Sequence, residues 1–87
     1  MVCQRVIVRS ISGLHLRPAG ILCHEAMRFQ SEIILTFRDT KANAKSVLSV
    51  LGACVKCGDE ILLTCEGADE EEALSSLVEK IESGLGE

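Results

Sequence analysis

The sequence has very few aromatic residues: no tryptophan, no tyrosine and two phenylalanines among 87 residues. Proteins that bind single-stranded nucleic acids stack the bases on aromatic rings and contact the phosphates with Lys and Arg. This chain offers few rings and carries a formal net charge of −4, so we expect no nucleic-acid binding. Because 47% of the residues are hydrophobic, the sequence predicts a core of Val, Ile, Leu and Ala.

Long apolar runs are also missing. No stretch approaches the ~20 residues of a membrane span, and residues 1–5 lack the apolar region of a signal peptide. We therefore expect a cytoplasmic protein without membrane insertion. A chain of 87 residues has the size of one small domain, and we assign residues 1–87 to it.

The five cysteines are an odd number without an export signal, which argues against a disulfide framework. Cys3, Cys23 and Cys65 lie in apolar runs, where a free cysteine is usually buried. Cys54 and Cys57 have the spacing of a redox or metal motif, but no second pair of ligands completes a tetrahedral site. We predict no metal and no cofactor, and keep a redox or metal role for this pair as a minor alternative.

The apolar pattern predicts four strands, at residues 2–8, 32–37, 41–44 and 60–65, and three helices, at residues 16–29, 47–52 and 70–83. Ser46 and Asp69 are predicted to cap the second and third helices. The order β-α-β-β-α-β-α favours an α+β open-faced β-sandwich, with a four-stranded antiparallel sheet covered on one face by three helices. Three apolar residues would then lie on the open face, as a weak patch or a self-association surface: Ile7, Ile34 and Leu62.

The strongest candidate for a functional residue is His15. Gly13 permits a sharp turn before it, because glycine tolerates positive φ, and Pro18 is favoured in the first turn of a helix. His15 is therefore predicted at the start of a helix, beside the free backbone N–H groups of Leu16 and Arg17. Such a helix start binds anions.

Chemistry at His15 is expected to involve phosphate. The positive helix end favours the neutral, nucleophilic imidazole, and the Arg17 guanidinium offers paired donors to phosphate oxygens. The alternative is a histidine that only caps the helix. His24 is an internal control, because it lies inside the helix without such neighbours.

Ser46 is the second candidate. As an N-cap it would contribute about 1 kcal/mol to its helix. Phosphorylation there would place negative charge at a helix N-terminus, which the fold tolerates. Position alone favours the capping role.

The charges are unevenly distributed along the chain. Residues 1–45 carry a net charge of +4 and residues 46–87 one of −8. An acidic last helix accounts for most of this difference. The alternative is that the basic half contacts anionic groups or acidic partners.

Residues 13–19, Gly-Leu-His-Leu-Arg-Pro-Ala, resemble the active-site signature of the HPr family, the histidine-containing phosphocarriers of the bacterial phosphoenolpyruvate-dependent sugar phosphotransferase system. Residues 43–51 are similar to the regulatory serine segment of its Gram-positive members. Residues 67–70 and 84–87 also resemble the family, so the resemblance extends over the whole chain.

The resemblance implies a phosphoryl carrier and not an enzyme. His15 would accept the group, through Nδ1, from phosphorylated enzyme I and pass it to the A components of sugar permeases, with Arg17 steadying the phosphohistidine. Ser46 would be the substrate of an ATP-dependent HPr kinase/phosphorylase, and its phosphate would slow transfer at His15 and recruit a catabolite-control transcription factor. The chain would act as a monomer, with a docking surface formed by Leu16, Gly20, Ile21, Val47, Leu48 and Leu51.

Several departures from the family pattern bear on partner choice. Leu16 replaces a small residue and Gly20 a larger one, Leu48 and Leu51 replace methionines, and the C-x-x-C pair is an addition. The chain also resembles the Crh regulatory paralogues, at residues 1–2 and 26–29, but those proteins lack the histidine. Besides a general carrier, we therefore consider a carrier dedicated to one pathway and a regulatory interaction protein acting through phospho-Ser46.

Overall fold

The computed structural model describes all residues from 1 to 87. The chain forms β1 (Val2–Ile7), α1 (Leu16–Ala26), β2 (Glu32–Phe37), β3 (Thr40–Asn43), α2 (Val47–Gly52), β4 (Glu60–Glu66) and α3 (Glu70–Glu82). The predicted order of elements is confirmed. None of the helices combines the length and the apolar character that a membrane crossing requires.

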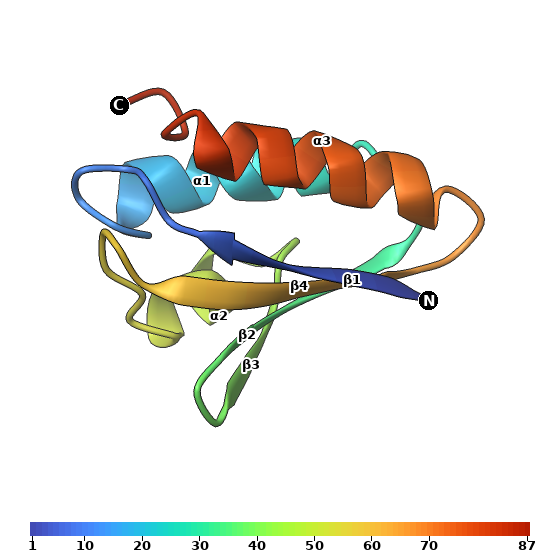
Figure 1. Cartoon of the computed structure of the whole chain (residues 1–87), viewed down its shortest axis with the longest axis horizontal. Coiled ribbons are helices and arrows are strands. Elements are labelled where there is room, and N and C mark those ends of the chain that lie inside the picture. The colour runs from blue at the N-terminus through green and yellow to red at the C-terminus, as the bar shows by residue number, and fades with distance from the viewer.

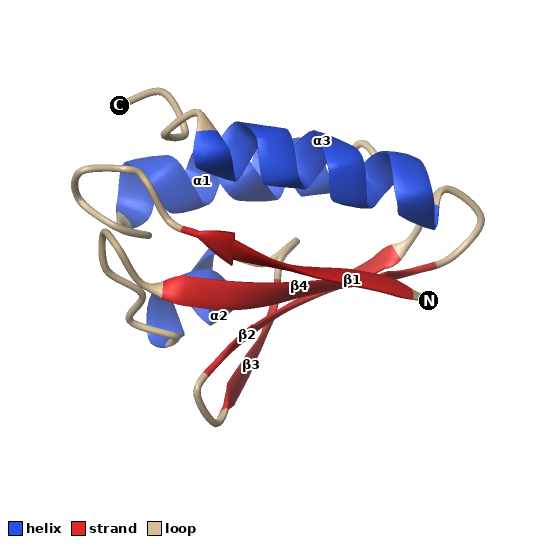
Figure 2. Cartoon of the chain, viewed as in Figure 1, coloured by secondary structure: helices blue, strands red, loops and turns tan.

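The four strands form one antiparallel sheet in the order β1-β4-β2-β3. Helices α1 and α3 lie side by side over one face of this sheet (Figure 1), and α2 contacts α1 and β3. The layers are seen most clearly in the colouring by secondary structure (Figure 2). This is the predicted open-faced sandwich, with β1 and β3 as its edge strands.

The core lies between the sheet and the helices and is aliphatic. Alternate residues of β2 and β4 are fully buried on one face, as predicted from the period of two: Ile33, Leu35, Ile61, Leu63 and Cys65. They face the buried side chains of α1 and α3, which include Leu22, Leu77 and Ile81. Only one of the two phenylalanines, Phe29, is buried in the core.

Three local expectations were wrong. Helix α1 ends at Ala26 and not at residue 29, although Phe29 remains buried after the turn. Cys3 is exposed, because it lies on the open face of β1. Asp69 is the N-cap residue of α3, but its side chain makes no capping hydrogen bond: the carboxylate accepts hydrogen bonds from the backbone N–H groups of Gln30 and Ser31, each at 2.9 Å, and from the Ser31 hydroxyl.

The open face of the sheet carries the predicted apolar residues. Ile7 is 38% exposed, and the half-buried Ile34 and Leu62 line a shallow hollow of about 540 Å³ on this face. The alternation of strand residues therefore places apolar side chains on both faces of the sheet, and the helices cover one of them.

Candidate functional site

The loop between β1 and α1 is held against the segment that precedes β4. The backbone N–H of Leu14 donates to the carbonyl of Val55 at 2.9 Å. Gly13 has a φ of 71°, and a Cβ atom at this position would come within 2.6 Å of the same carbonyl oxygen. Because the Ser10 hydroxyl also donates to the Gly13 carbonyl at 2.7 Å, the turn before His15 has a defined shape.

His15 is the N-cap residue of α1, as predicted. Its backbone is extended, with φ −77° and ψ −174°, and its carbonyl accepts the N–H of Ala19 at 2.8 Å. The imidazole makes no capping hydrogen bond, and the residue is exposed. The side chain is therefore not needed to cap the helix, and it is accessible to a partner.

The first turn of α1 provides donors beside the imidazole. The N–H groups of Leu16 and Arg17 precede that of Ala19, the first N–H to donate to a carbonyl of this helix turn, so they have no partner in the helix and are available to an anion. Arg17 is exposed, and its guanidinium forms no ion pair with any acidic side chain. Pro18, with no N–H, is buried in this turn, where its missing donor costs nothing.

A carboxylate that sequence reasoning missed also belongs to this site. Glu87 accepts hydrogen bonds from the N–H of Ser12 at 3.1 Å and from the Ser12 hydroxyl at 2.9 Å. These bonds lower the pKa of Glu87, and the nearby Arg17 and His15 add smaller effects. Because the two partners are 75 positions apart, no local pattern indicates this contact.

A hollow of about 270 Å³ adjoins the imidazole. It is lined by residues from the loop, from α2 and from the segment after it: Leu14, His15, Leu51, Cys54, Val55 and Lys56. Of these, Leu51 was predicted from the resemblance, and Lys56 was not predicted. Cys54 has a φ of 56°, which is uncommon for a residue other than glycine. Cys54 and Cys57 are exposed free thiols, and no group of three or more His, Cys, Asp or Glu side chains suited to hold a metal ion is present.

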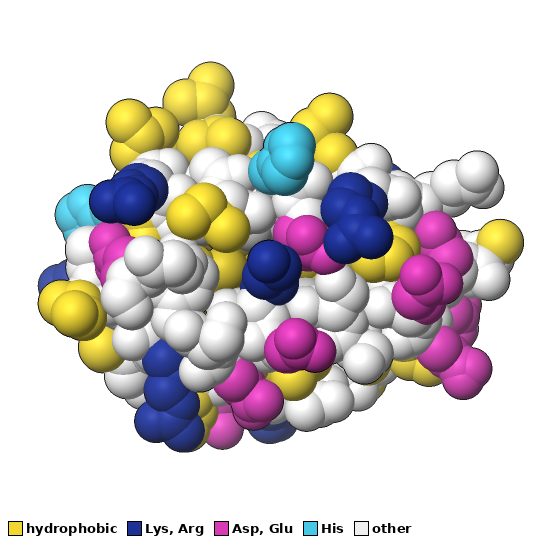
Figure 3. Space-filling model, turned by 90° about the horizontal axis from the view of Figure 1, so that it is seen from above, with side chains coloured by type: hydrophobic (Ala, Val, Ile, Leu, Met, Phe, Trp, Pro, Cys, Tyr) yellow, Lys and Arg dark blue, Asp and Glu magenta, His cyan; other side chains and the backbone are white.

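The predicted docking residues lie on two helices that contact each other, α1 and α2. Leu16 is 70% exposed and Leu48 is 82% exposed, and the remaining four are half-buried: Gly20, Ile21, Val47 and Leu51. Seen from above the helices, hydrophobic side chains gather along one margin of the molecule, while acidic side chains are concentrated along the opposite margin and one end (Figure 3). His24 is exposed on α1.

Ser46 is the N-cap residue of α2, and its hydroxyl accepts the N–H of Ser49 at 3.3 Å. The predicted capping role is confirmed. The residue is half-buried and directly precedes Val47, so it lies next to the predicted docking surface.

The comparisons with known proteins agree with this arrangement. Residues 2–83 match the family model described as PTS HPr component phosphorylation site. The HPr-like protein Crh of Bacillus subtilis is 43% identical over 77 residues, which cover 88% of this chain and 91% of that protein. The phosphocarrier protein HPr of Treponema pallidum is 40% identical and covers 88% of each chain.

A solved structure extends this likeness to three dimensions. The crystal structure of HPr-C-His from Thermoanaerobacter tengcongensis superposes with a TM-score of 0.96 at 38% identity, covering 100% of this chain and 98% of that one. The sequence relatives and the fold thus indicate the same family, whose members carry a phosphoryl group and are not enzymes. The chain belongs to the HPr family of phosphocarriers of the phosphotransferase system.

Proposed function

We propose that His15 takes a phosphoryl group from phosphorylated enzyme I and passes it to the A components of sugar permeases, in the cytoplasm. One observation carries the proposal: the exposed imidazole stands at the N-terminus of α1 without a capping hydrogen bond, beside two free N–H groups and the unpaired guanidinium of Arg17.

The transfer step exchanges one bond to phosphorus for another. A ring nitrogen of His15, Nδ1 by family resemblance, bonds to phosphorus as the bond between phosphorus and enzyme I breaks. When the group passes on, the bond to His15 breaks as phosphorus bonds to the acceptor. The N–H groups of Leu16 and Arg17 and the Arg17 guanidinium meet the negative oxygens of the moving group. Because all three are exposed, this stabilisation stays modest, which suits a carrier that has to release the group.

Partner docking is proposed for the apolar surface on α1 and α2. Leu16 and Leu48 project furthest into solvent, and aliphatic contacts of this kind are buried when a partner covers them. Gly20, Ile21, Val47 and Leu51 complete the surface. Leu51 also lines the hollow beside His15, so a partner that docks here lies against the imidazole.

Ser46 is proposed as a regulatory phosphorylation site for an ATP-dependent kinase. A phosphate on this N-cap is compatible with the helix N-terminus of α2. It would also place about two negative charges beside Val47 and the docking surface, which slows docking of enzyme I and allows recognition by a catabolite-control transcription factor.

A second candidate is a regulatory interaction protein that acts through phospho-Ser46. The 43% identity to the HPr-like protein Crh is the observation in its favour. In that case His15 would not be phosphorylated by a competent enzyme I. Phosphorylation of His15 by enzyme I therefore distinguishes the two candidates.

The decisive experiment incubates the protein with phosphoenolpyruvate and enzyme I and measures the intact mass. We expect one acid-labile phosphoryl group in the wild type and in His24→Ala, and none in His15→Ala. A wild type that stays unlabelled, while an authentic HPr is labelled in the same mixture, excludes the carrier. A parallel reaction with ATP and the kinase compares wild type with Ser46→Ala, which should not be labelled.

A further inference from the structure

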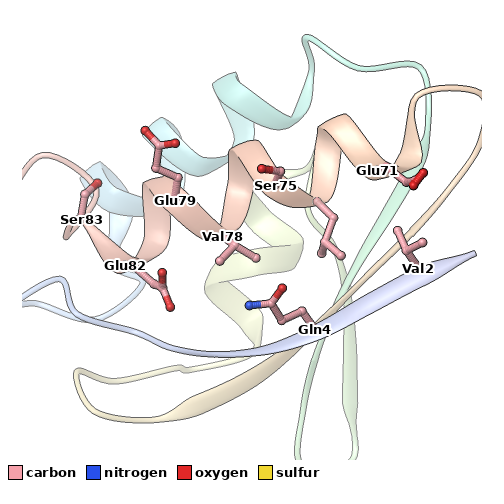
Figure 4. A pocket seen from close by; sticks show the side chains of 9 residues that line it. Val2, Gln4, Glu71, Ser75, Val78, Glu79, Glu82 and Ser83 are labelled. Carbon is pink, nitrogen blue, oxygen red and sulfur yellow. The ribbon is translucent and has the colours of Figure 1, made fainter.

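A groove of about 580 Å³ runs between α3 and β1 and shares no lining residue with the hollow beside His15. Its apolar base comes from three half-buried side chains, Val2, Leu74 and Val78. In the close view, Val78 points from α3 and Gln4 from β1 into the space between the two elements (Figure 4). The groove therefore has one wall made of a helix flank and one made of a strand.

The polar residues of this groove carry charge of one sign. Glu71, Glu79 and Glu82 line it, and no Lys, Arg or His does. None of the three glutamates takes part in an ion pair. A ligand for this groove is therefore expected to be cationic, because three unpaired carboxylates attract positive charge.

The strand wall belongs to the edge of the sheet. β1 pairs with β4 without interruption from Val2 opposite Cys65 to Ile7 opposite Glu60 and has no partner on its outer side. No bulge or proline breaks the strand. Such an edge presents backbone N–H and C=O groups to which an extended peptide can add.

We propose that this groove binds an extended basic segment of a partner protein, which adds to the outer edge of β1 as a fifth strand under the flank of α3. The proposal is independent of the phosphoryl chemistry of His15. Backbone hydrogen bonds to β1 would supply affinity, and the glutamates would supply specificity for basic residues.

The spacing of the groove predicts the sequence of that segment. Along α3, Glu71 and Glu82 are separated by about 16 Å, at ~1.5 Å per residue. Side chains on one face of a strand recur every second residue, so residues four apart are separated by ~13 Å. Two lysines four residues apart reach both glutamates, and an aliphatic residue midway between them lies over Leu74 and Val78.

The probe is the peptide acetyl-Ser-Lys-Thr-Val-Thr-Lys-Ser-amide, added to the full chain labelled with ¹⁵N. We expect saturable amide shifts in β1 and α3, slower amide exchange in β1 and no shifts at residues 13–17. Replacing both glutamates, in Glu71→Lys/Glu82→Lys, should weaken binding by about tenfold, because two attractions become repulsions. The milder variant Glu71→Gln/Glu82→Gln should weaken peptide binding by about threefold. It replaces the lysine variant in the test if the lysine variant does not fold.

The matched control is Glu66→Lys/Glu72→Lys, which changes the net charge equally at exposed positions outside the groove. It should leave affinity within about twofold. Equal weakening by both double variants would show attraction to net charge alone and overturn the proposal. So would binding without slower exchange in β1, equal binding of a peptide with glutamates in place of the lysines, or concentration-dependent shifts in β1 without peptide, which indicate a second copy in the groove.

Discussion

The Glu87 carboxylate accepts both donors of Ser12, its N–H at 3.1 Å and its hydroxyl at 2.9 Å, in the loop that carries His15. The same carboxylate lies close to Arg17 and His15, which add smaller effects that lower its pKa. An internal anion thus lies beside the position proposed for the phosphoryl group. Two negative groups that lie close together disfavour each other.

Neutralising this carboxylate in Glu87→Gln is expected to favour the phosphorylated form. Repulsion between the phosphoryl oxygens and residue 87 falls, while the amide oxygen of the variant can still accept from Ser12. At a fixed ratio of phosphoenolpyruvate to pyruvate, the ratio of phosphorylated to free protein should rise by about threefold. Intact-mass spectrometry after equilibration with enzyme I measures this ratio.

Glu82→Gln is the control for the Glu87 variant, since it removes one exposed negative charge at the end of α3. Its phosphorylated fraction should match the wild type. A Glu87→Gln protein that is phosphorylated to a lower extent than the wild type would show that the carboxylate supports the phosphorylated state and does not oppose it.

Much of this fold could be predicted because the patterns that indicate its strands, helices and turns lie within short stretches of sequence. The period-two pattern groups the apolar residues of β2 and of β4 on one face, and the helical spacing groups Leu77 with Ile81; these are the faces that are buried. The position of His15 at a helix start followed from Gly13 and Pro18 alone. These features depend on backbone preferences and side-chain periodicity, and both can be recognised from residues that are close together in the sequence.

Two contacts that the sequence did not reveal join distant segments. Asp69 has the residue type and position of a cap, but its carboxylate binds Ser31, 38 positions away. The contact between Ser12 and Glu87 likewise joins residues that are 75 positions apart. Tertiary partners of this kind leave no periodic signal in a sequence. Cys3 is a different case, because its burial was expected from its apolar neighbours, whereas the period of two places it on the same open face of β1 as Ile7.

Gly13→Ala is expected to destabilise the protein by at least about 2 kcal/mol, because a positive φ is strained for alanine and its Cβ would lie within 2.6 Å of the Val55 carbonyl oxygen. Urea denaturation followed by circular dichroism measures this loss. Gly20→Ala in α1 is the control: a Cβ there meets no atom within 4 Å, and the change should stabilise the helix by about 0.5–1 kcal/mol. Equal stabilities of the two variants would contradict the close approach at Gly13.

The hydrogen bond from Ser76 of α3 to Glu25 of α1 is expected to make the stability of the protein depend on pH. Glu25 is buried, and the hydrogen bond from the Ser76 hydroxyl, with a smaller effect of Arg28, lowers its pKa from the usual 4.5. A lowered pKa in the folded state adds stability above pH 4.5 that is lost as the pH falls through the folded-state value. Ser76→Ala should therefore lower the free energy of unfolding by about 1–2 kcal/mol at pH 7, and by less at pH 3.

Ser75→Ala is the control for Ser76→Ala, because Ser75 is exposed on the same helix. Its free energy of unfolding should stay within about 0.5 kcal/mol of the wild type at both pH values. Denaturant titrations at pH 7 and pH 3 make the comparison. A Ser76→Ala deficit that is equal at the two pH values would show that the bond does not depend on the charge of Glu25.

The two roles of Ser46 are expected to separate by substitution. Ser46→Ala removes the acceptor for the Ser49 N–H and should cost about 1 kcal/mol of stability. Ser46→Asp keeps a capping oxygen and adds negative charge at the helix N-terminus, so its stability should stay within about 0.5 kcal/mol of the wild type. Its initial rate of phosphorylation by enzyme I should nevertheless fall, while that of Ser46→Ala should not; a Ser46→Asp rate equal to the wild-type rate would contradict electrostatic control of docking.

The five thiols are expected to react in two groups. Cys3, Cys54 and Cys57 are exposed, whereas Cys23 and Cys65 are buried and burial raises the pKa of both thiols. Since the thiolate is the reactive form, Ellman's reagent at pH 8 should modify three thiols rapidly in the native protein. The other two should react only as fast as the protein opens, so all five react at once in denaturant. Cys3→Ser should reduce the number of rapidly reacting thiols by one, and Cys65→Ser should leave that number unchanged. An unchanged number in Cys3→Ser would place Cys3 in the core and contradict its position on the open face of β1.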